Sequence, residues 1–214
     1  MANLWAFGDS FVYGEDVEPD ETFPHYMALD LDLFCINMGR RGNNNPTIVN
    51  DILRKKSYFK KDDFILVSLT TPHRNEQKHL YNVARDFANN GYITLVDYCK
   101  QIRTIENCLE GFNYKITQAF NPVFGYDYKL DPYIEPNNFI EWGKPNNTLV
   151  DIISYNWLEN NKHHIFFGNH ESKLYSALTF PKKNFMKNNK HPSKVGHRLI
   201  ADKLLQYIKY DNSN

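Results

Sequence analysis

Cysteine, an excess of charge and long apolar runs are all scarce in this sequence of 214 residues. Its three cysteines, Cys35, Cys99 and Cys108, have no paired spacing and form no Cys-x-x-Cys, which argues against a disulfide framework and a structural zinc site. Lys and Arg number 25, as do Asp and Glu, so the formal charge of +0 lacks the basic excess typical of nucleic-acid binders. No apolar run approaches the roughly 20 residues that span a bilayer.

Cofactor signatures are missing as well. The sequence has neither a Gly-x-x-x-x-Gly-Lys-Ser/Thr phosphate loop nor a Gly-x-Gly-x-x-Gly fingerprint. His163, His164 and His170 lie close together, but no carboxylate at metal-ligand spacing accompanies them, so we expect no metal and no organic cofactor. The first residues show no basic segment followed by an apolar one. We therefore expect a cytoplasmic protein, with a phage virion or a host cell open as other locations.

Strand-like and helix-like segments alternate along the chain. Short apolar runs predict strands over 4–7, 34–37, 64–69 and 114–120, and helical spacing predicts helices over 23–31, from 45, over 80–87, over 95–109 and over 193–210. This alternation predicts an α/β fold with a mainly parallel sheet in a single domain, 1–214. Residues 121–180 are rich in Pro, Asn and aromatics, and we interpret them as a loop-rich insertion or lid before the last helix.

Ligands of such sheets bind where the strands end, and three segments with reactive or flexible residues lie there. Gly8, Asp9 and Ser10 follow the first strand, where a serine hydroxyl projects from the sheet and its own N–H can face an oxyanion. The alternative is an ordinary turn in which Ser10 caps a helix. The glycine-flanked turn 37–43 follows the second strand and can donate backbone N–H groups to an anion, or it is simply a connection.

The third segment, 191–197, precedes the last helix. Its His191 would lie at the mouth of the fold as a general base for a nucleophile, unless it is a surface histidine. We interpret His197 as a packing or surface residue.

In this order and spacing, the three segments resemble the motifs of the SGNH (GDSL-type) hydrolases. The match covers Phe7 to Phe11, the turn 37–42, and the final stretch from His191 to Ala201. The resemblance implies a three-layer α/β/α sandwich of the flavodoxin-like kind. It also implies Ser10 as nucleophile, His191 as base, and the N–H groups of Ser10 and Gly42 as an oxyanion hole.

Two positions depart from the family pattern. Asn188 stands three residues before His191, where the family has Asp, and we expect its amide to orient the imidazole. The third block of the family, usually Gly-x-Asn-Asp, is replaced here by 69–74, in which Pro72 has no N–H to donate. The further oxyanion donor would then come from Thr71, His73, Arg74 or Asn43, a choice that the sequence leaves open.

Several residues near the expected site are candidates for substrate binding: Asp9, Arg40, Arg41, His73 and Arg74. The arginines would favour an anionic acyl or sugar group, or they are solvated loop residues. The resemblance implies a serine esterase that cleaves a carboxylic ester, with a carbohydrate O-acetyl group as the specific case. The alternatives are a non-catalytic binding module, for example for a glycan, and an acyltransferase that uses the same serine. We expect a small-molecule or glycan ester as partner, no nucleic acid and no membrane span; the oligomeric state stays open.

Overall fold

A four-stranded parallel sheet forms the centre of the fold. The computed structural model describes residues 1–70, 97–119, 140, 149, 186–187 and 191–211. Within them the strand order is β2-β1-β3-β4, with β1 Asn3–Phe7, β2 Phe34–Asn37, β3 Phe64–Leu69 and β4 Asn113–Gln118. Each neighbouring pair is parallel, so the carboxyl ends of the strands share one edge.

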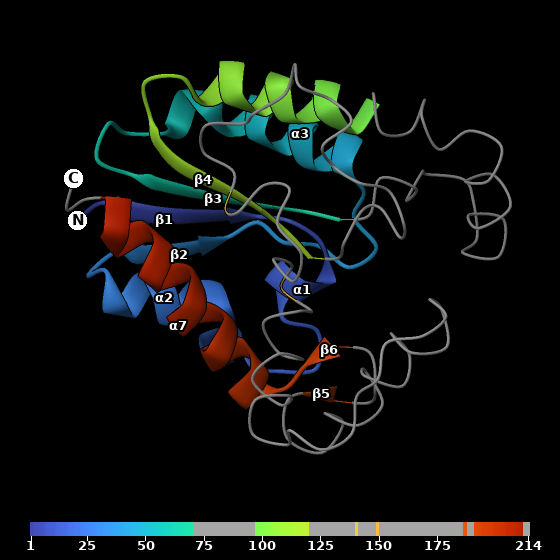
Figure 1. Cartoon of the computed structure of the whole chain (residues 1–214), viewed down its shortest axis with the longest axis vertical. Coiled ribbons are helices and arrows are strands. Elements are labelled where there is room, and N and C mark those ends of the chain that lie inside the picture. The colour runs from blue at the N-terminus through green and yellow to red at the C-terminus, as the bar shows by residue number, and fades with distance from the viewer. Residues whose placement is uncertain (71–96, 120–139, 141–148, 150–185, 188–190, 212–214) are drawn as a thin grey trace, which may run out of the picture.

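Helices cover both faces of this sheet (Figure 1). On one face lie α2, Phe23–Asp30, and α7, Lys194–Asp211; on the other lie α3, Asn45–Lys55, and a helix over 97–109. The single-turn helix α1, Ser10–Tyr13, follows β1, and two short strands, β5 Met186–Lys187 and β6 His191–Pro192, pair antiparallel beside it. Short 3-10 helices span Pro19–Glu21 and Lys56–Tyr58.

The alternation of side chains along β1 and β3 divides the core into two clusters. Leu4 and Ala6 of β1 belong to the cluster that packs against α2 and α7, while Trp5 and Phe7 belong to the one beneath α3 and helix 97–109. Because successive side chains of a strand point to opposite faces, a run that is apolar throughout requires cover on both sides. The predicted three-layer α/β/α sandwich with a parallel sheet is therefore confirmed.

The predicted elements agree closely with this architecture where both can be compared. The strands over 34–37 and 64–69 have the predicted bounds, and the one predicted over 114–120 spans Asn113–Gln118. The helix predicted over 80–87 lies outside the described residues, as does the insertion or lid over 121–180 apart from residues 140 and 149. The single domain stays a prediction. None of the helices in the described part of the chain is long and apolar enough to cross a membrane.

A buried carboxylate ties the amino ends of the central strands together. Asp63, just before β3, accepts hydrogen bonds from the backbone N of Asn3 (2.8 Å), Asn3 Nδ2 (3.0 Å), Trp5 Nε1 (2.8 Å) and the backbone N of Lys60 (3.0 Å). Burial alone would raise the pKa of Asp63, but these donors outweigh it and hold that pKa below its usual value. The carboxylate thereby fixes the register between β1 and the start of β3.

We expect Asp63→Asn to lower the free energy of unfolding by about 3 kcal/mol, because an amide nitrogen would replace an acceptor of buried donors. The contribution of Asp63 is present above its unfolded-state pKa of about 3.9 and is lost as the pH falls through the lower folded-state value. Urea unfolding at pH 7 measures the loss, with the exposed neighbour Asp62→Asn as control. Equal unfolding midpoints for the two variants would contradict this role.

Candidate active site

The residue predicted as nucleophile begins a one-turn helix at the carboxyl end of the central strand β1. Asp9 is the N-cap, and its side chain accepts a hydrogen bond from the backbone N of Phe11 (3.0 Å). Ser10 is thus the first helical residue, and the alternative in which Ser10 itself is the cap is wrong. The helix ends at Gly14, which has a φ of 78° and whose N–H donates to the Ser10 carbonyl (3.1 Å). Asp9, a candidate for substrate binding, is fully buried beneath this turn.

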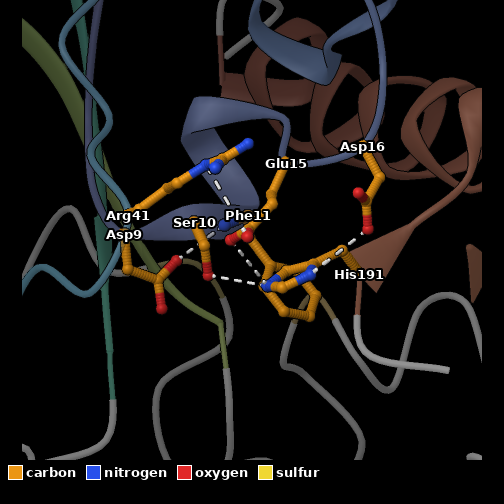
Figure 2. A network of polar contacts seen from close by, with 7 residues as sticks. All are labelled: Asp9, Ser10, Phe11, Glu15, Asp16, Arg41 and His191. Atoms are coloured by element: carbon orange, nitrogen blue, oxygen red, sulfur yellow. Dashed lines mark hydrogen bonds and ion pairs between the residues drawn. The ribbon is translucent and has the colours of Figure 1, made fainter. Parts of the chain in front are cut away.

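The structure brings His191 to Ser10 from the other end of the sequence. His191 Nε2 lies 3.0 Å from Ser10 Oγ, across 181 residues of chain, and its side chain is 15% exposed. The ring packs edge-on against Phe11, with centroids 6.0 Å apart (Figure 2). Two of the three residues predicted as catalytic, Ser10 and His191, are therefore in hydrogen-bonding contact. His191 occupies β6, just before α7.

Two carboxylates surround the same imidazole, and the sequence analysis missed both of them. Glu15 Oε2 lies 3.3 Å from His191 Nε2, and Asp16 Oδ2 lies 3.9 Å from His191 Nδ1 (Figure 2). The other carboxylate oxygen of Glu15 lies 3.6 Å from Arg41 Nε. The signal in the sequence was an acidic pair directly after the glycine that ends the Ser10 turn. The motifs of the SGNH hydrolases contain no such acidic pair, so the resemblance did not point to these two residues.

The turn after β2 is attached to the carbonyl oxygen of Gly8, two residues before the serine. That oxygen accepts from the backbone N of Arg40 (3.2 Å) and from Asn43 Nδ2 (3.0 Å). Gly42, the predicted oxyanion donor, has a φ of 69° and open space where a Cβ would be. The side chain and the backbone N of Asn43 thus hold the turn, since the latter donates to the Arg40 carbonyl (3.3 Å).

A second residue, Asn37, joins this turn to the serine helix. Its Nδ2 donates to the carbonyl of Val12 (2.7 Å), and its Oδ1 accepts from the backbone N of Gly39 (2.9 Å). Gly39 approaches so closely that a Cβ there would lie 2.3 Å from the backbone N of Tyr13. Asn37 therefore clamps the two segments at a separation that only glycine permits, a role that the sequence analysis had not given it.

The two arginines of the turn each have a carboxylate partner. Arg40 Nη2 lies 3.1 Å from Oδ1 of Asp51, whose side chain is only 5% exposed, so Arg40 compensates a buried charge. Arg41 pairs with Glu15 and also lies over the Tyr13 ring, 5.3 Å from its centroid. Of the pair, Arg41 is the one that the structure brings to the Ser10–His191 site (Figure 2).

The end of β3 is held by one amide side chain. Asn45 Oδ1 accepts from the backbone N of Thr70 (2.8 Å), and Asn45 Nδ2 donates to the carbonyl of Thr70 (3.1 Å). Thr70 belongs to the segment 69–74, which replaces the third motif of the SGNH family. Its candidates Thr71, His73 and Arg74 lie outside the described residues, as does Asn188.

His197, the other histidine near the site, is a fully buried packing residue of α7. Its Nδ1 accepts from the backbone N of Phe23 (3.2 Å), and the two rings stack with centroids 5.9 Å apart. Burial first, and then the proximity of His191, lower the pKa of His197 to about 3. Within the described residues, no group of three or more His, Cys, Asp or Glu is placed to hold a metal ion.

Comparison with solved structures finds chains that are similar to this one over most of its length. One is a candidate lipolytic protein of the G-D-S-L family from Desulfitobacterium hafniense, with a TM-score of 0.52 and 10% identity over 96% of this chain and 99% of that one. A G-D-S-L lipolytic family member from Veillonella parvula has a TM-score of 0.49 and 18% identity, over 98% and 99% of the two chains. A catalytic mutant of an acetylxylan esterase from Geobacillus stearothermophilus has a TM-score of 0.44 and 14% identity, over 97% and 95%. No family model and no curated protein matches.

We expect Gly39→Ala to force the turn away from α1, because its Cβ would meet backbone atoms of Tyr13 and Val12 that cannot rotate aside. Overpacking of this kind costs about 1–3 kcal/mol, measurable by urea unfolding, and the displaced turn would weaken any Ser10-dependent reaction. The matched control is Gly42→Ala in the same turn, which keeps its N–H, meets no atom within 4 Å and has only backbone strain to absorb. Wild-type stability in Gly39→Ala would refute the close approach.

The low pKa of His197 makes stability depend on pH. The unfolded chain binds a proton near pH 6.5, whereas folded His197 does so only near pH 3, so stability falls as the pH drops through this window. We expect His197→Asn, whose Oδ1 can replace Nδ1 as acceptor, to lack this loss. Its stability relative to wild type should therefore improve by about 2 kcal/mol between pH 7 and pH 5 in denaturant titrations. Parallel pH profiles for the two proteins would contradict a neutral buried His197.

Proposed function

We propose that this protein is a serine hydrolase that cleaves a carboxylic ester, with Ser10 as nucleophile and His191 as base. The observation that supports this most directly is the 3.0 Å contact between Ser10 Oγ and His191 Nε2. A serine hydroxyl is a weak nucleophile until an adjacent base accepts its proton, and this distance suits that transfer. The position of Ser10 at the carboxyl end of a central parallel strand, on a fold shared with G-D-S-L proteins, supports the same conclusion.

In this mechanism Ser10 Oγ bonds to the acyl carbon while its proton passes to His191 Nε2. The tetrahedral intermediate then collapses, its bond to the leaving oxygen breaks, and Nε2 returns the proton to the departing alcohol. A water molecule attacks the acyl-serine in the second half, with His191 accepting the proton of the water and passing it to Ser10 Oγ. The products are a carboxylic acid, an alcohol and the free serine. The Glu15 carboxylate, 3.3 Å from Nε2, favours the positive charge that the imidazole carries between these steps.

The oxyanion of the intermediate would be bound by the backbone N–H groups of Ser10 and Gly42. The carbonyl of Gly8 holds the Gly42 turn beside the serine through two hydrogen bonds, which gives the donors a fixed relative position. Donors fixed before the reaction need no reorganisation as charge develops, and one such donor contributes roughly 10²–10³ in turnover. Asn43, expected as an oxyanion donor, uses its Nδ2 and its backbone N within the turn, so we propose a positioning role for it in place of a donor role. Thr71 remains a candidate for a further donor.

For the substrate we propose a polar ester, with an O-acetyl group on a carbohydrate as the specific case. Tyr13, 45% exposed, is on the same helical turn as Ser10, and its ring, Arg41 and Glu15 form a rim of aromatic and charged groups. Such a rim suits hydrogen bonding and ring stacking with a sugar better than burial of a long acyl chain. Arg41 remains the candidate for contacts with an anionic substrate, whereas Arg40 is engaged by Asp51.

A fluorophosphonate probe tests the nucleophile directly, because it reacts with serines that their surroundings have activated. We expect one adduct on Ser10 by peptide mass spectrometry, absent in Ser10→Ala and slowed at least about 10²-fold in His191→Ala, which removes the base. Ser57→Ala, at an exposed serine of the 3-10 helix Lys56–Tyr58, is the matched control and should label like wild type.

Three other outcomes would redirect the conclusion. No adduct on folded protein, together with saturable binding of a glycan, would favour a non-catalytic binding module. An adduct on Ser10 with acyl transfer to a sugar acceptor faster than hydrolysis would favour an acyltransferase. Labelling that persists in Ser10→Ala would refute the assignment of the nucleophile.

A further inference from the structure

We propose that Asp16 is the carboxylate that orients His191, a role that the sequence had suggested for Asn188 and that rests on the serine-histidine mechanism above. Asp16 is a positioning residue, since it acts on the imidazole and not on the substrate. The carboxylate that orients His191 would thus belong to the turn after the nucleophile, six residues after Ser10. It would not belong to the segment just before His191, where Asn188 stands.

The two nitrogens of His191 define what such a residue must do. Nε2 faces Ser10 Oγ at 3.0 Å and must carry a lone pair to accept the hydroxyl proton. The ring proton of the neutral imidazole must therefore lie on Nδ1, and the group that fixes this tautomer must face Nδ1. The carboxylate oxygen of Asp16, 3.9 Å from Nδ1, lies on that side of the ring (Figure 2).

The separation of 3.9 Å is an ion-pair distance, longer than a hydrogen bond. Catalytic contacts are often long without substrate and shorten in the reacting complex, when the imidazole becomes positively charged. The Asp16 side chain is 30% exposed, so it lies at the surface of the site beside the ring. A shift of about one ångström would convert the ion pair into a charge-assisted hydrogen bond.

The backbone of Asp16 provides an independent reason to single it out. Its φ of 74° places it in the left-handed region, which residues other than glycine adopt rarely, Asn and Asp more often than the rest. Hydrogen bonds on both sides hold this conformation, from the backbone N of Glu15 to the Ser10 carbonyl (3.2 Å) and from that of Val17 to the Gly14 carbonyl (3.2 Å). The turn therefore places the Asp16 side chain beside the ring at a cost in backbone strain, as is often found at functional sites.

Glu15 does not fit this role, although it is closer to the ring. Its Oε2 faces Nε2, the nitrogen that must keep a lone pair for Ser10, and its Oε1 is shared with Arg41. A carboxylate at Nε2 favours the imidazolium and, in the neutral ring, a proton on Nε2, so it opposes the tautomer that Ser10 needs and does not fix it. His197 on α7 also lies near His191, but it stays neutral above about pH 3. Asp16, in contrast, has its carboxylate on the Nδ1 side of the ring.

Nitrogen-15 NMR of the full chain reads the tautomer of His191 without any substrate. We expect neutral His191, assigned by comparison with His191→Gln, to carry its proton on Nδ1 in wild type and to shift towards the Nε2–H form in Asp16→Asn. Asparagine tolerates the left-handed backbone as aspartate does, so the variant should fold. The matched control is Asp32→Asn, since Asp32 is exposed and also has a positive φ, of 54°, but lies in the turn after α2.

Turnover provides the second readout. Asp16→Asn should lower kcat by roughly 10²–10⁴, the range between ordinary general-base effects and loss of the correct tautomer, and should leave KM nearly unchanged. Asp16→Glu should restore part of kcat, and Asp16→Gly, which relieves the backbone strain but lacks the carboxylate, should not. Glu15→Gln and Asp32→Asn should keep the Nδ1–H tautomer.

The outcomes separate this proposal from the proposed function. Retention of the Nδ1–H tautomer in Asp16→Asn would overturn the role of Asp16, and so would loss of that tautomer in Asn188→Ala alone. A tautomer shift in Asp16→Asn, in a protein that neither hydrolyses esters nor reacts with the fluorophosphonate probe, would support the positioning role and overturn the hydrolase. Equal loss of the tautomer in Asp32→Asn would show a general structural effect and overturn the proposal.

Discussion

The carbonyl oxygen of Gly8 is the point on which the geometry of the candidate site depends. It lies at the end of the central strand and accepts hydrogen bonds from the backbone of Arg40 and the side chain of Asn43. The residues that follow Gly8 form the turn that carries Ser10. Arg40 and Asn43, which donate these two hydrogen bonds, belong to the turn that carries Gly42. Asn37 and the close approach of Gly39 add a second link between the same two segments. Two loops that would otherwise move independently are thereby fixed to the rigid edge of the sheet.

The third component of the site reaches this edge by a different route. His191 lies in a short strand that leads into α7, and α7 packs on the face of the sheet that carries Leu4 and Ala6. Burial of the apolar stripe of α7 therefore fixes the direction from which His191 approaches Ser10. His197 contributes to the same docking, because it stacks on Phe23 of α2 and accepts its backbone N–H. A neutral, fully buried histidine in this position secures the helix that follows His191.

Much of this arrangement could be predicted from the sequence, because it depends on strong local signals. Short apolar runs predicted the strands, and helical periodicity predicted the bounds of α7 to within a residue. The ordered motifs predicted that Ser10 and His191 share one site. Glu15 and Asp16 could not be found in this way. Their position beside His191 depends on a left-handed turn and on the approach of a segment far along the chain, neither of which leaves a periodic pattern. The cap at Asp9 was missed because Asp and Ser are both good N-caps, so only the observed dihedrals decide between them.

The long sequence separation between Ser10 and His191 also affects when the site can exist. A ribosome adds roughly 5–20 residues per second, so about 10–40 s pass between the synthesis of the serine and that of the histidine 181 positions later. Throughout that interval the nascent chain would carry a serine without a base, and hence an inert hydroxyl. Under the proposed mechanism, reactivity would begin only once α7 has docked, which protects acyl groups nearby from a half-made enzyme.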